Sequence, residues 1–423
     1  MLKEYLLNLK KDAGGWFLFF FIVYVILMMK ALSLGTFRDS AFFSFYSIVI
    51  TVYILSRFLL AYFHASPDFD EKYKPTVTFV VPAKNEEDNI AETIRKFSQV
   101  NYPKNKIEVI TINDGSTDKT LEQMYKIKRE IGSLIKIRIV NWKQNRGKRE
   151  GMAEGVRLAT NQIVIFIDSD SFIEKECVRH LTKYFSNPRV GAVSGHTDVF
   201  NRDKNILTQM QGVRYYISFK IYKAAESIFG TVTCCPGCCS AYRKTYLVEY
   251  LEEWLNQRFL GRKCTFGDDR SLTNFMIRKY EAVYCSEAQA YTVVPDNFRK
   301  YLRQQQRWKK SWVRETLIAS SFMWRKNFLA SISFYTYVFL AFASPSVFLR
   351  ALVYKPYISH ELPIAYLAGL FLMLFLHGLY YRIRVGKRAW ILAVLSFWFN
   401  TVILMWQLPW AVLTMNDTRW GTR

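Results

Sequence analysis

The sequence predicts an α/β domain that is inserted between N-terminal and C-terminal transmembrane helices and is flanked by interfacial amphipathic helices. Three observations support this fold class. Long apolar stretches lie near both ends of the chain, the middle part alternates short β-rich runs with helical periods, and the 423 residues are 51% hydrophobic and only 22% charged. Such a chain is too apolar to be disordered and is typical of a protein that contacts lipid.

Two segments near the N-terminus are long enough to cross a membrane. Trp16–Leu34 is almost continuously apolar, and at about 1.5 Å per residue it would cover the roughly 30 Å hydrocarbon core of a bilayer. Lys3, Lys10 and Lys11 precede it without a small-residue cleavage site, which favours an uncleaved N-terminus in the cytosol. A second span over Ala41–Phe63 would return the chain to the cytosol.

The middle of the chain has the sequence pattern of a soluble α/β domain. Short runs rich in β-branched residues alternate with helical periods, which is the pattern of a mostly parallel sheet. The expected strands are Thr76–Val81, Ile107–Ile112, Ile135–Val140 and Ile163–Ile167, and the expected helices are Ile90–Ser98, Leu121–Ile131 and Arg149–Ala159.

Three more apolar segments follow, at Phe328–Leu352, Pro363–Tyr381 and Trp390–Thr414. The third contains Pro409, which lacks an N–H and disrupts helices, so we expect this segment to be broken or re-entrant. Three full crossings would instead place the C-terminal tail outside. The expected division is two spans in 1–66, a cytosolic domain in 67–323, further spans in 324–414 and a terminal loop in 415–423.

The formal net charge of +23 suggests nucleic acid, an anionic membrane surface or an acidic small substrate as partner. Lys and Arg beside anionic lipid on the cytosolic side explain much of it. A nucleic-acid-binding or channel protein would use the charge but has no need for the ordered carboxylate motifs described below. We therefore expect a lipid bilayer and no nucleic acid.

Four of the seven cysteines fall in one run, at Cys234, Cys235, Cys238 and Cys239. An odd total is a poor disulfide framework, and a zinc site would need a second ligand pair at suitable spacing. Reduced, structural cysteines in a cytosolic domain are the expected state.

Polar motifs follow the first two expected strands. Asn85 and Glu86 come after the strand that ends at Pro82, where short polar side chains suit the edge of a base, although a helix N-terminus would look similar. Asp114 ends the next strand and could accept a hydrogen bond from a uracil or ribose group. An ordinary helix cap would explain Asp118 but not the carboxylate at the strand end.

A pair of carboxylates, Asp168 and Asp170, follows the strongly apolar strand Ile163–Ile167. Hard divalent cations prefer such oxygen ligands. Mg²⁺ or Mn²⁺ held there would bridge a diphosphate and neutralise charge on a departing nucleoside diphosphate. Surface turns often produce two aspartates at this spacing, so the spacing alone does not indicate a metal site. The apolar strand before the pair and the other motifs support that interpretation.

A further carboxylate pair, Asp268 and Asp269, lies in the run Phe266-Gly267-Asp268-Asp269-Arg270. A sugar hydroxyl that attacks an anomeric carbon needs a base within hydrogen-bond reach, and Asp269 is the candidate. A helix start explains Asp268 equally well.

Gln304, Arg307 and Trp308 share one face of the helix-like run Phe298–Arg314. Arg307 suits a diphosphate, and Trp308 suits stacking beneath a sugar ring. An amphipathic interfacial helix explains the mixture of basic and aromatic residues but not this grouping.

Together, in this order, these motifs resemble the processive family-two glycosyltransferases with a GT-A fold, which include cellulose, chitin and hyaluronan synthases. The segments around Leu255–Gly261, Gly267–Asn274 and Val294–Trp308 are similar to hyaluronan synthases, and so is Trp420-Gly421-Thr422-Arg423, which belongs to a gating loop in that branch. The cysteine-rich run Cys234–Arg243 departs from that branch and is similar to nodulation chitooligosaccharide synthases.

The resemblance implies an inverting, processive enzyme in the cell membrane, with a cytosolic catalytic domain that passes the nascent polysaccharide through its own helices. UDP-GlcNAc and UDP-GlcA would give hyaluronan, and UDP-GlcNAc alone would give chitin, a chitooligosaccharide or poly-N-acetylglucosamine. A non-processive dolichyl-phosphate sugar synthase shares the first three motifs but not the Gln304 group or the flanking spans. The oligomeric state is left open, with a monomer as one option.

The resemblance also assigns roles to residues. The nucleotide would be bound by Asn85, Glu86, Asp114 and Lys148, and Mg²⁺ or Mn²⁺ by Asp168 and Asp170, with Asp168 also contacting the substrate. Asp269 would be the base, and the acceptor and diphosphate site would be formed by Gln304, Arg307 and Trp308. The gating residues would be Trp420 and Arg423. Lys148 is in addition a cation just after a glycine turn, although a solvated surface charge would look the same.

Overall fold

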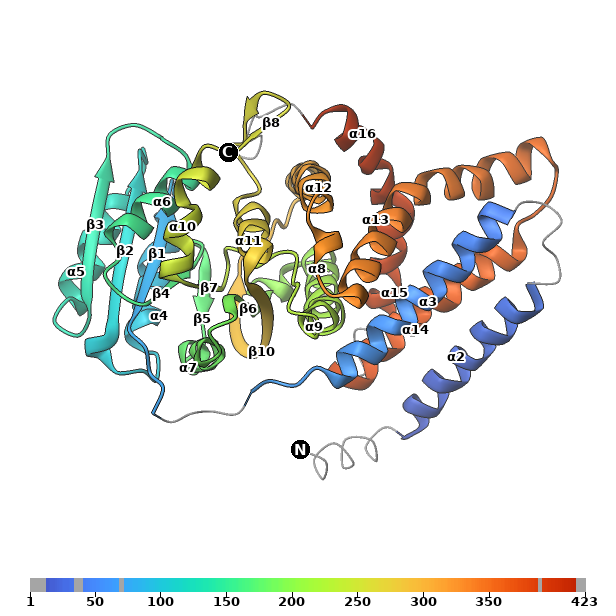
Figure 1. Ribbon diagram of the computed structural model, residues 1–423, viewed down its shortest axis with the longest axis horizontal. Helices are drawn as coiled ribbons and strands as arrows, with labels where there is room; N and C mark the ends of the chain where they lie inside the picture. Colours follow the sequence, from blue (N-terminus) through green and yellow to red (C-terminus); the bar gives the residue numbers. More distant parts are fainter. Residues whose placement is uncertain (1–12, 34–40, 68–71, 387–389, 416–423) are drawn as a thin grey trace.

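The computed structural model describes residues 13–33, 41–67, 72–386 and 390–415. Among them, five helical segments are long and apolar enough to cross a membrane. The first two, α2 (Ala13–Ser33) and α3 (Ala41–Phe63), agree with the predicted N-terminal spans. These helices lie together at one side of the molecule, away from the β-sheet (Figure 1).

The sheet has eight strands in the order β3-β2-β1-β4-β7-β6-β10-β5. Its first half is parallel and consists of the four predicted strands, with ends shifted by at most two residues: β3 (Lys136–Trp142), β2 (Ile107–Asp114), β1 (Val77–Ala83) and β4 (Ile163–Phe166).

The second half of the sheet is mixed, although six of the eight strands still run in one direction, in agreement with the expected mostly parallel sheet. Strand β7 (Ser240–Arg243) runs antiparallel to both β4 and β6 (Val190–Val199), and β5 (Ser171–Ile173) runs antiparallel to β10 (Glu281–Thr292). Only β6 and β10 pair in parallel here. The short strands β5 and β7 carry too little alternation to predict, and their direction is set by their neighbours in space. The longer strands β6 and β10 were not among the predicted strands either.

Helices cover both faces of the sheet. On one face α4 (Ile90–Ser98), α5 (Thr120–Ile131) and α7 (Cys177–Thr182) bury their apolar sides, and on the other α6 (Lys148–Leu158), α10 (Lys244–Leu255) and α11 (Asp268–Lys279) do so. The predicted helices thus correspond to α4, α5 and α6, each within one residue at either end.

Contact between α6 and the sheet is close enough to require a glycine. A Cβ on Gly155 would lie 2.2 Å from the side chain of Val80. The helix can therefore approach β1 closely, which places its N-terminus at the carboxyl ends of the strands.

Two amphipathic helices, α8 (Ile206–Ile217) and α12 (Phe298–Ser320), join the sheet domain to the apolar helices. Helix α8 packs on α15 (Trp390–Trp398), and α12 packs on α16 (Gln407–Leu413). Helix α12 is also anchored to the sheet domain, because the buried Glu315 carboxylate accepts a hydrogen bond from Asn274 of α11 at 3.1 Å.

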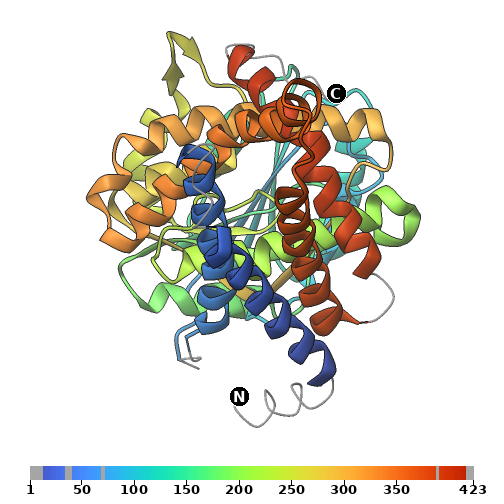
Figure 2. The ribbon, with the colours of Figure 1, turned by 90° about the vertical axis from the view of Figure 1, so that its right-hand side faces the viewer.

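The remaining apolar helices are α13 (Phe328–Leu349), which continues as the π-helical η7 (Arg350–Ile358), and α14 (Ile364–Val385). Figure 2 views the molecule from the side on which they lie. Both begin within one residue of the predicted starts at Phe328 and Pro363.

The last apolar segment is broken, as predicted, and the break lies just before Pro409. Between α15 and α16 the chain forms a π-helical turn, η8 (Phe399–Ile403), and a 3₁₀ turn, η9 (Leu404–Trp406). Pro409 is in the first turn of α16, where a missing N–H costs little. Ile391–Leu413 as a whole is long and apolar enough to cross a membrane, so a re-entrant path stays a prediction.

Candidate active site

A cavity of about 1430 Å³ lies at the carboxyl ends of the parallel strands. Open α/β sheets bind ligands at this edge. Its wall continues past the sheet to α12, then to α13 and to the break in the last apolar segment. The lining includes Asp114, Lys148, Asp168, Asp170, Asp269, Gln304, Arg307, Trp308, Tyr337, Ser344 and Asn400.

Three charged groups converge around Gly237 in the cysteine-rich loop. A Cβ on this glycine would lie 2.8 Å from Asp168 Oδ1, 2.9 Å from Lys148 Nζ and 3.1 Å from Asp269 Oδ1. The three side chains come from the loop after β4, from α6 and from α11, so the fold brings Asp269 to residues that lie more than a hundred positions earlier in the chain. Any side chain at position 237 would fill the space between them.

The predicted base, Asp269, lies in the first turn of α11. Burial raises the pKa of this carboxyl, the nearby Lys148 ammonium opposes that rise, and the Asp168 carboxylate adds to it. The Gly237 N–H donates a hydrogen bond to Asp269. The net effect is a raised pKa, which makes the ionised carboxylate a stronger base than an exposed aspartate.

The predicted nucleotide cation, Lys148, is the first residue of α6 and forms an ion pair with Asp168 at 2.5 Å. Burial disfavours its charge, but the Asp168 and Asp269 carboxylates outweigh burial and raise its pKa above the ordinary lysine value. Lys148 thus stays charged and faces the cavity.

Asp114 holds the loop that precedes Lys148. Its carboxylate accepts hydrogen bonds from the main-chain N–H groups of Arg146, at 2.6 Å, and Gly147, at 3.0 Å, and from the Asn145 side chain at 3.0 Å. Gly147 has a φ of +99°, which favours glycine. The carboxylate thus fixes the turn before α6, a contact that the sequence did not suggest, and contact with uracil or ribose stays a prediction.

The donor set at the end of β4 fits a hard divalent cation. Asp168 and Asp170 both line the cavity, and the described residues contain no cluster of three or more acidic, histidine or cysteine ligands. Magnesium sites commonly use one or two carboxylates and complete their shell with phosphate oxygens and water. Cys238 donates weakly to Asp168 Oδ2 at 3.5 Å, and burial beside these carboxylates raises the pKa of its thiol.

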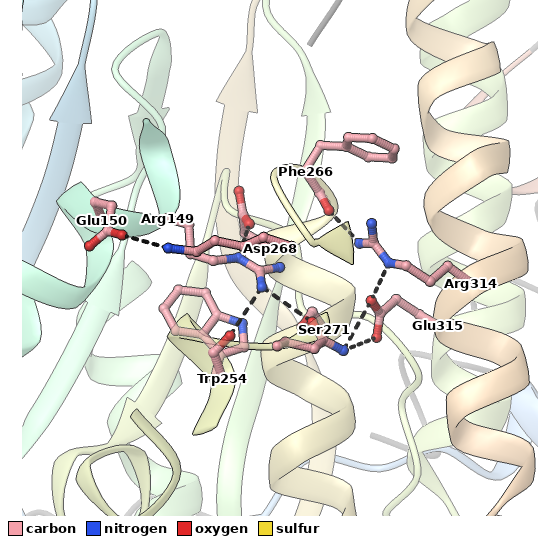
Figure 3. A network of polar contacts seen from close by, with 10 residues as sticks. Arg149, Glu150, Trp254, Phe266, Asp268, Ser271, Arg314 and Glu315 are labelled. Atoms are coloured by element: carbon pink, nitrogen blue, oxygen red, sulfur yellow. Dashed lines mark hydrogen bonds and ion pairs between the residues drawn. The ribbon is translucent and has the colours of Figure 1, made fainter. Parts of the chain in front are cut away.

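The neighbour of the base, Asp268, has a structural role. Its side chain is 2% exposed and pairs with Arg149 Nε at 2.7 Å, and the Arg149 guanidinium lies over the ring of Trp254 (Figure 3). Arg149 also donates to the Trp254 carbonyl at 3.1 Å. This network ties α6 to α10 and α11.

On α12, the residues Gln304, Arg307 and Trp308 all line the cavity, as their shared helical face predicted. The next residue, Gln305, is 1% exposed and accepts a hydrogen bond from Arg214 of α8. Further along α12, Arg314 donates to the Phe266 carbonyl and pairs with Glu315, which fixes the helix against the loop before Asp268 (Figure 3).

Some predicted ligands are not brought to the cavity. Its wall in the described chain includes Pro82, Ala83 and Lys84 but not Asn85 or Glu86. Asn85 has a φ of +54°, and its side chain accepts from the Thr117 N–H at 2.9 Å. Their nucleotide contacts stay a prediction. Trp420 and Arg423 lie outside the described residues.

Several residues around the cavity were not foreseen. Its wall includes Arg214, Trp312 and Asn400, and Gly237 lies beside the charged groups. The glycine within the cysteine run was the one available signal for the loop, because such a position permits a close approach. All seven cysteines lie in the described part of the chain and are free thiols, as expected.

The mixed sheet, the carboxylates at its strand ends and the flanking apolar helices define a glycosyltransferase of the GT-A fold that is attached to a membrane. The comparisons with known proteins agree. The pattern of Glycosyl transferase family 2 matches residues 78–251. The matched segment contains most of the sheet and the motifs at its strand ends.

Among curated proteins, the hyaluronan synthase of Streptococcus pyogenes is 27% identical over 410 residues, which cover 96% of each chain. An N-acetylglucosaminyltransferase of Azorhizobium caulinodans is 34% identical over 262 residues, 62% of this chain and 65% of that protein. Among solved structures, a mannosyltransferase from Pyrobaculum calidifontis in complex with GDP-Man and Mn²⁺ has a TM-score of 0.59 at 19% identity, covering 90% of this chain and 99% of that one. The structural likeness supports the fold.

Proposed function

We propose that this glycosyltransferase polymerises UDP-sugars processively and passes the product between its own apolar helices. The observation that carries the proposal is the extent of the cavity. One continuous wall includes Asp168 and Asp269 at the strand ends, Trp308 on α12, Tyr337 on α13 and Asn400 in the broken segment. A transferase that released each product would not need such a wall.

In the proposed reaction, ionised Asp269 removes the proton from the acceptor hydroxyl as that oxygen attacks the anomeric carbon of the donor. The bond between this carbon and the UDP oxygen breaks, and attack from the opposite side inverts the anomeric configuration. The Gly237 N–H orients the Asp269 carboxylate, and Lys148 and Arg307 bring positive charge toward the departing diphosphate.

Asp168 and Asp170 would hold a Mg²⁺ or Mn²⁺ ion, which supplies charge neutralisation on the diphosphate when bound. Lys148 already pairs with Asp168, so donor binding would redistribute the contacts of this carboxylate. Asp114 would contribute by holding the turn before Lys148, and Asn85 and Glu86 remain proposed nucleotide ligands.

For the donors, we propose UDP-GlcNAc and UDP-GlcA and hence hyaluronan as the product. The similarity to the streptococcal hyaluronan synthase over 96% of both chains supports this choice. The alternative is a chitin, chitooligosaccharide or poly-N-acetylglucosamine synthase that uses UDP-GlcNAc alone. It is supported by the higher identity to the Azorhizobium N-acetylglucosaminyltransferase and by the cysteine-rich run Cys234–Arg243.

A product assay tests both. Purified protein in detergent is incubated with Mn²⁺ and UDP-GlcNAc, with and without UDP-GlcA, and the product is digested with hyaluronidase or chitinase. The proposal expects long, hyaluronidase-sensitive polymer only with both donors. Long chitinase-sensitive polymer from UDP-GlcNAc alone would select the alternative, and single-sugar products under all conditions would refute processive synthesis.

The proposed setting is the cell membrane, with residues 67–323 in the cytosol between the spans in 1–66 and 324–414 and with residues 415–423 as a gating loop. Deletion of Trp420–Arg423 should then sharply reduce synthesis without unfolding the protein. A truncated protein with undiminished activity would contradict the gating role.

A further inference from the structure

The break in the last apolar segment exposes a polar side chain to the cavity. Within Trp390–Leu413 the polar side chains are Ser396, Asn400, Thr401 and Gln407. Polar groups in apolar, membrane-facing helices are expensive, and π-helical turns occur often at functional sites. Asn400 lies in the π-helical turn η8 and lines the same cavity as Asp269.

Only one of the two polar atoms in the Asn400 amide has a hydrogen-bond partner among the described residues. Its Nδ2 donates to the Ser396 carbonyl at 2.6 Å, while its buried Oδ1 has no hydrogen-bond partner among the described residues. Such an acceptor without a partner is costly to bury. A ligand with hydroxyl or N–H donors would satisfy it.

The facing helix α12 supplies matching groups. Phe399, next to Asn400, packs against the ring of Phe298 with centroids 5.7 Å apart, so the break lies along the first turns of α12. On α12, Gln304 Oε1 and Gln305 Nε2 are also buried without a partner in the described chain, and both residues line the cavity. Gln305 is held by Arg214 through its other amide atom.

We infer that Asn400, Gln304 and Gln305 form a subsite that retains the growing saccharide chain on the membrane side of the transfer site. This inference rests on the proposed function and deepens it. Two free amide oxygens accept from sugar hydroxyls, and one free amide N–H donates to a sugar oxygen. Trp308 and Trp312, which line the same cavity, offer flat faces for the sugar rings. Neutral amides with aromatic rings suit a carbohydrate better than a nucleotide.

Retention sets product length, because the mean length of a processively made polymer is the ratio of elongation rate to release rate. Loss of one neutral hydrogen bond to the chain should raise the release rate about 3- to 10-fold. Asn400→Leu, which keeps the number and branching of the side-chain heavy atoms, should therefore shorten the product about 3- to 10-fold. The affinity for UDP should stay within about twofold, because the nucleotide binds at the strand ends.

The test uses the full chain in lipid nanodiscs, with both UDP-sugars and Mn²⁺. Product length is measured by size-exclusion chromatography with light scattering, and UDP affinity by calorimetry. The matched control is Gln407→Leu, since Gln407 is on the same segment and also has a buried amide oxygen without a described partner, but does not line the cavity. Asn400→Ser should restore part of the length.

Shorter product from Asn400→Leu with unchanged UDP affinity and normal length from Gln407→Leu would support the subsite. Equal shortening in both variants would assign the effect to packing of the segment on α12 and overturn the inference, as would unchanged length or an equal loss of UDP affinity. If Asn400→Leu does not fold, Asn400→Ala, which removes the same amide without adding apolar bulk, carries the same expectation. Absence of polymer from the unmodified protein would instead refute the proposed function.

Discussion

The two ends of the cavity differ in chemistry. At the sheet end, carboxylates and one ammonium group come from strand ends and helix N-termini and lie around Gly237: Asp168, Asp269 and Lys148. At the membrane end, the wall includes amide and aromatic side chains from α12, α13 and the broken segment, such as Gln304, Trp312, Tyr337 and Asn400, beside basic groups of α12 such as Arg303 and Lys309. In the proposed reaction, one end transfers a proton and binds a diphosphate, while the other holds the saccharide chain through its hydroxyl groups and ring faces.

In the proposed processive reaction, this difference separates the two tasks of the enzyme. Substitutions at the sheet end should change the rate and the donor affinity, whereas substitutions at the membrane end should change product length. A substitution at one end that alters the property assigned to the other would break the comparison.

The largest effect is expected from Asp269→Asn. Because the amide cannot accept the hydroxyl proton, the rate of UDP release in the presence of acceptor should fall by about 10³-fold. The shape of the site is kept, so the affinity for UDP should change little. Calorimetry with UDP and a coupled UDP-release assay measure the two quantities, and elongation near the unmodified rate would show that another group is the base.

Asp268→Asn, one residue away, provides the contrast. The Asp268–Arg149 pair is almost fully buried, with side chains 2% and 4% exposed, so removal of one charge leaves the other without its partner. The free energy of unfolding should fall by about 3 kcal/mol. The thermal unfolding midpoint in detergent should therefore be lower for this variant. A variant that retains full stability but loses activity would show that Asp268 takes part in the reaction.

A smaller effect is expected at the end of β4. Asp168→Asn or Asp170→Asn should weaken UDP-sugar affinity about 10- to 100-fold, because a charge-assisted contact to the cation is lost. EDTA should stop synthesis, and added Mn²⁺ should restore it. An exposed carboxylate on α5, Glu130, serves as control through Glu130→Gln. Full turnover in excess EDTA would remove the cation from the proposal.

The sequence was sufficient to predict the parallel half of the sheet and the motifs with a local pattern, but not the other half of the sheet. The strands β1 to β4 have strong apolar runs, and the polar residues that follow them lie at one edge of the sheet as a parallel arrangement requires. Helical spacing likewise placed Gln304, Arg307 and Trp308 on the cavity wall. The predicted motifs were therefore those with a local pattern.

What the sequence did not predict depends on contacts between distant segments. The antiparallel strand β7 is only four residues long, and its position between β4 and β6 depends on the whole chain. In the same way, no local pattern indicates that Gly237 approaches Lys148, Asp168 and Asp269, or that the Asp114 carboxylate fixes the turn before α6. These contacts arise from tertiary packing.

The smallest expected effect is a shift in the pH dependence of the rate, which compares the charged groups of the sheet end with one another. Burial raises the pKa of Asp269 above the ordinary aspartate value of 3.8, while Lys148 opposes the rise. Since the base acts in its ionised form, the rate should be maximal at pH values above the pKa of Asp269 and should fall as the pH drops through that pKa. This fall should occur at a higher pH than it would for an exposed aspartate. Lys148→Met removes the opposing charge, so the acid limb of its residual activity should move to still higher pH, whereas Glu130→Gln should leave the limb in place. An acid limb that moves to lower pH in Lys148→Met would show that Asp269 is not the group that titrates.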